Sequence, residues 1–133
     1  MKLLLTLMIV VTGTLCLAKG NYTLHSEIQY KSHEESLLNC LDIYTPDELE
    51  SKTGEIPVMI MIHGGAWRTG DKSNKNVTVN KVPYFISNNW IFVSINYRLS
   101  PEVKHPAHVE DVAAAIAWVR ENISSYGGNA YKI

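Results

Sequence analysis

Short apolar runs and stretches of helical periodicity divide most of this chain into predictable elements. The segments Val58–Ile62 and Ile91–Ile95 are almost wholly apolar, which is typical of central strands covered on both faces of a parallel sheet. Ser26–Lys31 and Leu37–Tyr44 predict two earlier strands, separated by a polar turn. The pattern therefore predicts four strands before the chain reaches its most regular helix.

Two helices are expected, one on either side of the second apolar run. Val82–Asn89 has a proline in its first turn, and His108–Ile123 begins with Glu110 and Asp111, where the helix dipole favours negative charge. Lys132-Ile133 would begin a further strand. This alternation of strands and helices predicts an α/β fold with right-handed crossovers. The apolar residues of the longer helix repeat every three or four positions and should share one buried face: Val109, Val112, Ile116, Val119 and Ile123.

The first 18 residues have the layout of a secretory signal peptide. A basic start precedes the apolar stretch Leu3–Val11, and small residues suit cleavage after Ala18. The stretch is shorter than the roughly 20 residues that a membrane-spanning helix needs, so no span is expected after cleavage. A buried N-terminal helix, an uncleaved anchor and a lipoprotein acylated at Cys16 are the alternatives. Residues 19–36 would then form an N-terminal segment with the first strand.

Composition adds three constraints to this picture. The chain has 133 residues, a formal net charge of −1, 46% hydrophobic residues and 19% charged residues, which indicates a globular protein and argues against nucleic acid as a partner. Cys40 is the only cysteine outside the leader and lies in an apolar run, so we expect a buried thiol without a disulfide. Sequons at Asn21, Asn76 and Asn122 would accept glycans in a eukaryotic secreted protein.

The segment from Ile60 to Ser73, IMIHGGAWRTGDKS, carries the candidate chemistry. Two glycines directly follow the end of an apolar strand, and glycine lets the backbone turn tightly without a side chain in the way. Backbone N–H groups in such a loop can converge on one oxygen that develops negative charge, as an oxyanion hole requires. The alternative interpretation is a plain turn between a strand and a loop.

Five motifs in order resemble the secreted esterase and arylformamidase-like branch of the α/β-hydrolase superfamily. They include His-Gly-Gly-x-Trp at residues 63–67 and cover nearly the whole chain from about Leu37. The resemblance implies the N-terminal half of an α/β-hydrolase fold: a mostly parallel sheet with flanking helices, preceded by an antiparallel strand pair. The motifs are LDIYTP at 41–46, HGGAWRTGDK at 63–72, NYRLSP at 96–101, HP with EDVAAA within 105–115, and YGGN at 126–129.

The resemblance also implies a role for residues around the glycine loop. His63 would support the loop rather than act as the catalytic base, and Arg98 would fix neighbouring loops through hydrogen bonds. Trp67 would pack beneath the loop or line the acyl pocket. His105 stands where the family often has an aromatic residue, which suggests a different substrate pocket. The oxyanion-hole loop corresponds to Gly64, Gly65 and Ala66, with the N–H groups of Gly65 and Ala66 as the main donors.

The nucleophile of this family lies on a G-x-S-x-G elbow, and the sequence contains no such motif. Residues 37–133 are therefore expected to be the N-terminal part of an esterase domain that is truncated before the elbow and lacks the Ser, Asp and His of the triad. We expect a secreted serine-type hydrolase of carboxylic ester or amide bonds, inactive as this chain alone. A non-catalytic binding protein on a degenerate hydrolase scaffold is the alternative.

The expected partner is a small-molecule ester or an acylated carbohydrate. No organic cofactor is implied. No metal is implied either, because His105 and His108 lie three residues apart without a third ligand in view.

Overall fold

The computed structural model describes residues 21–32, 36–48 and 55–133. The predicted signal peptide, residues 1–18, lies outside these ranges. Within them, no helix is both long enough and apolar enough to cross a membrane.

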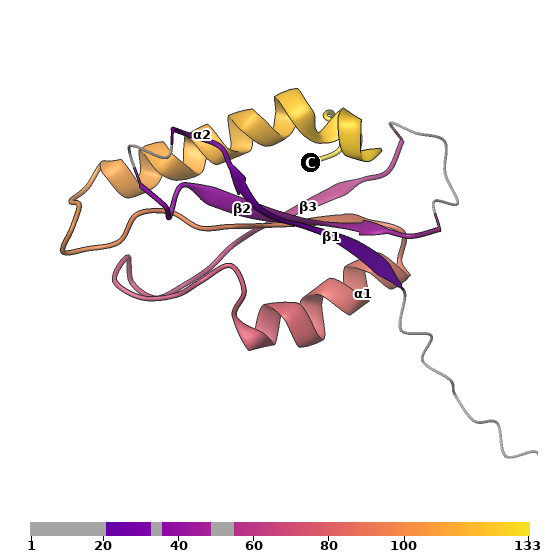
Figure 1. Cartoon of the computed structure of the whole chain (residues 1–133), viewed down its shortest axis with the longest axis horizontal. Helices are drawn as coiled ribbons and strands as arrows, with labels where there is room; N and C mark the ends of the chain where they lie inside the picture. Colours follow the sequence, from indigo (N-terminus) through magenta and orange to yellow (C-terminus); the bar gives the residue numbers. More distant parts are fainter. Residues whose placement is uncertain (1–20, 33–35, 49–54) are drawn as a thin grey trace, which may run out of the picture.

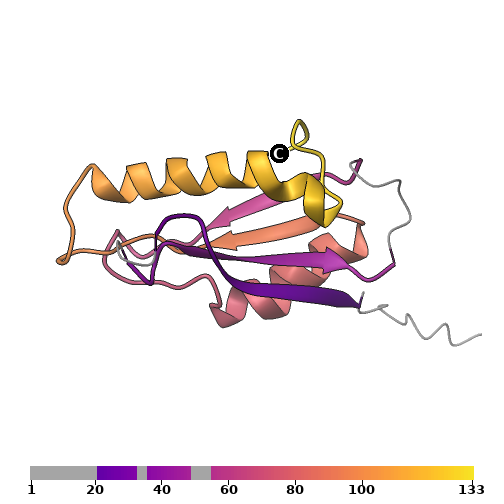
Figure 2. The same ribbon diagram turned by 45° about the horizontal axis from the view of Figure 1, so that its top comes forward.

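Four strands form one twisted sheet with helices on both faces (Figures 1 and 2). The spatial order is β1-β2-β4-β3. β1 pairs antiparallel with β2, β2 pairs antiparallel with β4, and β4 pairs parallel with β3. The leading antiparallel pair is therefore present, and the described strands make a mixed sheet whose parallel part is the β3–β4 pair. The strands are β1 (Tyr22–Gln29), β2 (Cys40–Pro46), β3 (Val58–Ile62) and β4 (Ile91–Ile95).

The two apolar runs coincide with β3 and β4 to the residue, whereas the first two strands differ from the prediction. β1 begins four residues earlier than expected, because Tyr22 still pairs with Pro46 at the far end of β2. β2 begins only at Cys40, because residues 37–39 form a turn in which Asn39 N donates to Ser36 O (3.2 Å). Strand pairing, rather than the local alternation of side chains, sets these ends.

The helices lie on opposite faces of the sheet (Figure 1). A short π-helix leads directly into α1 on one face, and α2 covers the other face before a 3₁₀ turn ends it. α1 stops two residues before the predicted end, Asn89, which adopts a left-handed φ of 58°. The elements are the π-helix Val77–Lys81, α1 (Val82–Ser87), α2 (Ala107–Asn122) and the 3₁₀ turn Ile123–Tyr126.

The core has two parts because successive side chains of a strand point to opposite faces. Ile91, Val93 and Ile95 of β4 pack with α2, whereas Phe92 packs with Val82 and its neighbours on the α1 side. Every residue of β4 is buried, which matches its continuous apolar sequence.

The buried face of α2 differs from the predicted one. Val119 is buried as expected, but Val109 is 48% exposed. The fully buried positions of the helix include two polar residues, and the apolar Val112 and Ile116 are only partly covered. The face that meets the sheet consists of His108, Asp111, Ala115 and Val119, and Ile123 of the following turn continues it.

The end of the chain lies against the outer side of β3 instead of forming the expected strand. Asn129 N donates to Ile56 O (2.8 Å), and Val58 N donates to Lys132 O (2.9 Å). A single parallel bridge joins Ile56 to Gly128. The chain thus reaches the β3 edge in a parallel direction within its last six residues.

Candidate active site

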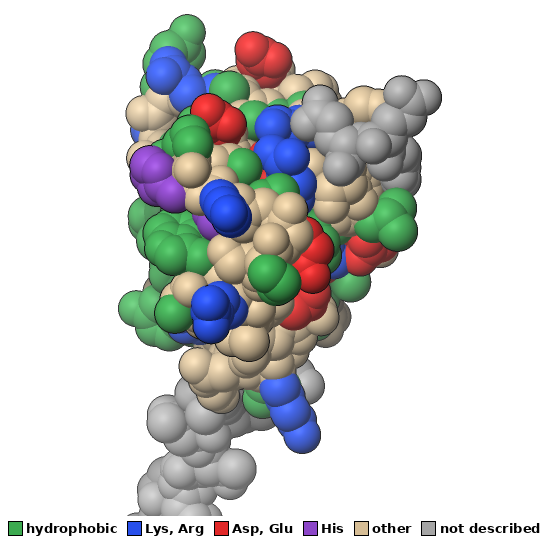
Figure 3. Space-filling model, turned by 90° about the vertical axis from the view of Figure 1, so that its left-hand side faces the viewer, with side chains coloured by type: hydrophobic (Ala, Val, Ile, Leu, Met, Phe, Trp, Pro, Cys, Tyr) green, Lys and Arg blue, Asp and Glu red, His purple; other side chains and the backbone are tan. Residues whose placement is uncertain are grey.

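The glycine loop emerges from the carboxyl end of β3, beside the loop that follows β4. Ligands of open α/β sheets bind in this position, at the carboxyl ends of the strands. Figure 3 views this end of the molecule, where hydrophobic and histidine side chains gather on one side and charged side chains lie across the middle. Both loops therefore contribute to one surface.

The backbone of the loop turns in a way that needs glycine at residue 65. Gly65 has a φ of 125°, and its carbonyl accepts hydrogen bonds from Arg68 N (3.0 Å) and Thr69 N (3.1 Å). A Cβ at Gly65 would lie 1.9 Å from Thr69 O, so no larger residue fits, whereas a Cβ at Gly64 would meet nothing within 4 Å. Ala66 (φ 52°) and Trp67 (φ 64°) also occupy the left-handed region, which costs energy for residues other than glycine.

This turn presents backbone donors to solvent. Gly64, Gly65 and Ala66 are all exposed. Within the described ranges, the amides of Gly65 and Ala66 donate to no protein acceptor. Two adjacent N–H groups without internal partners, held in a strained turn at the end of a parallel strand, can bind an oxygen that carries negative charge.

His63 holds the start of the loop through three contacts. Its carbonyl accepts a hydrogen bond from Tyr97 Oη (2.9 Å), and its ring stacks on the Tyr97 ring with centroids 4.4 Å apart. Its Nδ1 donates to Gly64 O (2.9 Å). A Cβ at Gly70 would lie 2.2 Å from that same Nδ1, so the loop folds closely over the imidazole. His63 is buried and fully engaged with the loop that it was predicted to support.

Trp67 lies between the two loops. Its ring packs against the rings of Tyr97 and His108, each with centroids 5.5 Å away, and Trp67 O accepts a hydrogen bond from Ser100 N (2.7 Å). The residue remains 47% exposed. Its indole therefore offers an apolar surface beside the loop, where the resemblance placed the acyl pocket.

A cavity of about 230 Å³ opens next to the loop. No group of three or more metal-binding side chains converges in the described ranges. Ser100 Oγ lies 3.2 Å from His108 Nε2 and 3.1 Å from Val103 O. The Ser100 hydroxyl is thus held by a carbonyl of its own loop and lies beside the first turn of α2. The cavity is lined by Met61, His63, Gly64, Gly70, Val77 and Lys81, among others.

The far end of the loop is anchored by polar groups that sequence reasoning passed over. Asn96, directly after β4, accepts a hydrogen bond from Lys72 N (2.7 Å) and donates to Asp71 Oδ2 (2.9 Å). The Lys72 ammonium, which is buried, binds the carboxylates of Glu27 and Asp42. The motifs at 41–46, 63–72 and 96–101 contain four of these five residues, but nothing in them indicates that the side chains meet.

Arg98 anchors the second loop through a residue whose role was predicted wrongly. Asp111 was assigned to the helix N-terminus, but it lies in the second turn of α2, fully buried. It accepts two side-chain hydrogen bonds from Arg98 (both 2.7 Å) and one from Lys31 (2.9 Å). Burial raises the pKa of Asp111, but the hydrogen bonds from these two cations outweigh it and bring the pKa to about 2.

Cys40 is the buried thiol expected from the sequence. It is free and 2% exposed. Burial raises the pKa of the thiol to about 12, so the reactive thiolate is scarce at neutral pH.

A profile of the BD-FAE family matches residues 41–133, which include both loops and all of the anchoring residues that follow β1. The chain belongs to the BD-FAE family. The structure and the relatives agree that this is an α/β-hydrolase type of fold. The predicted family resemblance is thereby confirmed.

Most named relatives of this BD-FAE chain are esterases, and one is named kynurenine formamidase. The probable carboxylic ester hydrolase LipM of Mycobacterium tuberculosis is 38% identical over 82% of this chain and 24% of its own length. Venom carboxylesterase-6 of Apis mellifera is 35% identical over 84% of this chain and 20% of its own length. The chain spans about a quarter of the length of the first curated relatives it matches.

Solved esterase structures superpose on the same region. Esterase B from Lactobacillus rhamnosis has a TM-score of 0.69 and 25% identity, covering 81% of this chain and 32% of its own. A truncated carbohydrate esterase from gut microbiota has a TM-score of 0.68 and 30% identity, covering 85% of this chain and 38% of its own.

Proposed function

We propose that this chain is the N-terminal part of a secreted carboxylic-ester hydrolase and that its glycine loop forms the oxyanion hole. The main support for this proposal is the pair of exposed amides at Gly65 and Ala66. Within the described residues these amides donate to no protein acceptor. They lie in a turn that requires glycine at residue 65. In the complete hydrolase a serine attacks the ester carbonyl, and a histidine takes the proton from the serine. The amides of Gly65 and Ala66 bind the oxygen of the tetrahedral intermediate.

The substrate class follows from the exposed surface beside the loop. Trp67 is half-exposed and supplies an apolar contact for the acyl or alcohol part of a small ester. Relatives named carboxylic ester hydrolase and carbohydrate esterase support a small ester or an acylated carbohydrate as substrate.

The donor role can be tested by removing a single N–H from the full-length hydrolase. Replacing Ala66 by L-lactic acid through nonsense suppression (Ala66→lactic acid) turns one amide into an ester and leaves the methyl side chain in place. We expect kcat for p-nitrophenyl acetate to fall about 100- to 1,000-fold with little change in KM, because the lost bond forms fully only in the transition state. Ala66→Gly keeps the N–H and tolerates the positive φ, so it is the matched control and should retain activity.

A second measurement tests the need for the missing triad. The 133-residue chain itself contains no G-x-S-x-G elbow, so we expect no hydrolysis of p-nitrophenyl acetate above background. Sustained turnover that an organophosphate abolishes would show a serine nucleophile within this chain and would refute the proposal. Unchanged activity of the full-length Ala66→lactic acid variant would refute the oxyanion role.

Export is the third part of the proposal, and it rests on the apolar leader alone. Mass spectrometry of the N-terminus of the protein collected outside the cell should find Lys19 as the first residue. An intact Met1 on the exported protein, or retention inside the cell, would contradict cleavage after Ala18.

A further inference from the structure

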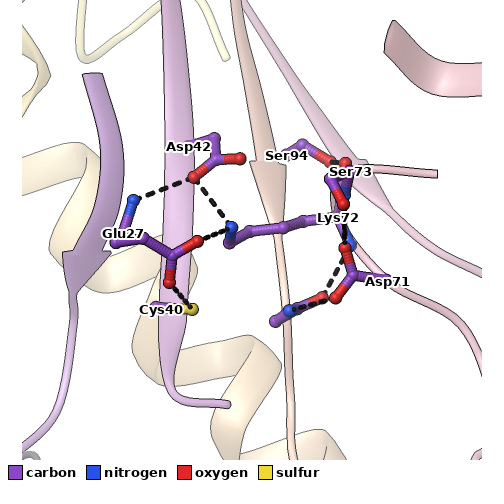
Figure 4. A network of polar contacts seen from close by, with 8 residues as sticks. Glu27, Cys40, Asp42, Asp71, Lys72, Ser73 and Ser94 are labelled. Atoms are coloured by element: carbon purple, nitrogen blue, oxygen red, sulfur yellow. Dashed lines mark hydrogen bonds and ion pairs between the residues drawn. The ribbon is translucent and has the colours of Figure 1, made fainter. Parts of the chain in front are cut away.

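The glycine loop is held at both of its ends, and the two ends use different chemistry. At the start, the His63 imidazole stacks on Tyr97 next to the loop. At the far end, Asp71 and Lys72 join a network of charged and polar groups that reaches across the sheet to β1 (Figure 4). The strained residues 65–67 lie between these two anchors. The position of the far anchor therefore helps to set their backbone geometry.

Lys72 is the centre of the far anchor. Its side chain is 5% exposed, and its ammonium binds Glu27 Oε1 and, at 2.9 Å, Asp42 Oδ1. Asp42 is also buried, with a side chain 5% exposed, whereas the Glu27 side chain is 67% exposed. A lysine is almost never buried to this extent unless it is paired. The two carboxylates compensate its burial, and the pKa of Lys72 is raised as a result.

A β-bulge turns Glu27 toward Lys72. The register of β1 against β2 shifts between His25 and Ile28, so that two residues of β1 face Asp42 alone. Glu27 has a left-handed φ of 56°, and Glu27 N donates to Asp42 Oδ1 (2.9 Å). Bulges re-aim side chains, and backbone strain of this kind persists only where the surrounding structure maintains it. Here the re-aimed side chain binds the lysine of the glycine loop.

The backbone beside Lys72 is fixed as firmly as its side chain. Lys72 N donates to Asn96 Oδ1 (2.7 Å), and Lys72 O accepts a hydrogen bond from Ser94 Oγ (2.8 Å). Asn96 is itself held in place, because its carbonyl accepts a bond from Tyr30 Oη (2.8 Å) and its amide donates to Cys40 O (2.9 Å). Residue 72 therefore has little freedom to move relative to β1, β2 and β4.

We infer that Lys72 is a positioning residue for ester hydrolysis: its ammonium, held between Glu27 and Asp42, fixes the far end of the glycine loop and so aims the amides of Gly65 and Ala66. Lys72 does not touch the substrate. The inference rests on the proposed esterase function and adds residues to its machinery. Preorganised donors lose most of their effect when they are displaced, and a shift of about 1 Å costs on the order of 100-fold in rate.

The test uses the full-length hydrolase and p-nitrophenyl acetate. Lys72→Met alone would leave Asp42 as an uncompensated buried charge, so the main variant is Lys72→Met with Asp42→Asn, which removes both buried charges together. We expect its kcat to fall about 10- to 100-fold while KM changes little. Lys72→Arg retains the charge and should recover most of the activity. Arg120→Met removes an exposed cation of α2 that belongs to neither loop anchor and should leave kcat unchanged.

A transition-state analogue separates positioning from mere stability. A trifluoromethyl ketone forms an oxyanion in the active site, so its inhibition constant should rise in the double variant by the same factor by which kcat/KM falls. Glu27→Gln leaves Lys72 paired with Asp42 and keeps the fold, and it should show the same pattern to a smaller extent.

Two results would overturn the inference in different ways. A folded double variant with the kcat and the inhibitor affinity of the wild-type protein would remove the positioning role and leave the esterase proposal intact. Absence of ester hydrolysis by the wild-type full-length protein would overturn the proposed function, and the inference with it.

Discussion

The loops that follow β3 and β4 are anchored by two charge clusters of opposite composition. Behind the β3 loop, one buried cation, Lys72, faces two carboxylates, of which Glu27 is exposed and Asp42 is buried. Behind the β4 loop, one fully buried carboxylate, Asp111, faces Arg98 and Lys31, whose side chains are 22% and 21% exposed. In each cluster the single member is buried, and in the Lys72 cluster one of its two partners, Asp42, is buried as well.

This difference indicates which residue each loop depends on. Removing one of two like charges leaves the buried partner still paired, whereas removing the single opposite charge leaves the partners unpaired. The β3 loop should therefore depend on a cation and the β4 loop on an anion. Their responses to mutation and to pH should differ accordingly.

The largest expected effect is that of Lys72→Met. Asp42 would remain buried without its cation, and breaking a buried pair in this way costs about 3–5 kcal/mol. Urea unfolding of the full-length protein should show this loss, and adding Asp42→Asn should restore part of it. A single variant within 1 kcal/mol of wild type, or a double variant less stable than the single one, would contradict the assignment.

Acid should act chiefly on the β4-loop cluster. The pKa of Asp111 falls from 3.8 to about 2 in the folded protein. Because the folded value is the lower one, the stabilisation is complete above about pH 5 and is lost as the pH falls through 4 toward 2. The difference corresponds to roughly 2 kcal/mol. Asp111→Asn should remove this dependence, and equal acid sensitivity of variant and wild type would show that other carboxylates cause it.

The strained bulge offers a smaller test of the β3-loop cluster. Glu27→Gly and Glu27→Ala both remove the carboxylate, but only glycine adopts a φ of 56° without strain. We expect Glu27→Gly to be about 1 kcal/mol more stable than Glu27→Ala. Equal melting temperatures would indicate that the bulge rearranges when the side chain is lost.

The smallest effects on stability should come from replacing Glu27 or Lys31, because a second residue of the same charge remains in each cluster. Glu27→Gln leaves Lys72 bound to Asp42, and Lys31→Met leaves Asp111 bound to Arg98. Each should change the free energy of unfolding by about 1 kcal/mol or less. A loss as large as that of Lys72→Met in either variant would break the comparison between the two loops.

Much of the fold was predictable because its signals are local. The apolar runs coincide with the ends of β3 and β4, but only β4 is covered on both faces as expected; β3 lies at the edge of the described sheet and is partly exposed. The limits of α2 were also nearly right, and its buried face was right at Val119 and Ile123 but wrong at Val109. The pattern favoured Val109, yet His108 and Asp111 turn inward because the β4 loop supplies their partners.

The candidate site divides in the same way. The glycine loop could be found from consecutive residues, because its chemistry depends on the backbone of a short segment. The charged anchors of the two loops could not, since Lys72 and Glu27 are 45 residues apart and Lys31 and Asp111 are 80 apart. A lone charged residue in a sequence looks the same whether it is exposed or paired in the interior.

The sequence by itself determined the family, the bounds of the two apolar strands and the loop that offers N–H groups, because neighbouring residues encode all of these. Only the tertiary structure decided which residues hold that loop and its neighbour in place. A one-residue shift in strand register turns Glu27 toward Lys72, and a helix turn buries Asp111 under Arg98. Both depend on contacts between distant segments, and such contacts exist only once the sheet has formed.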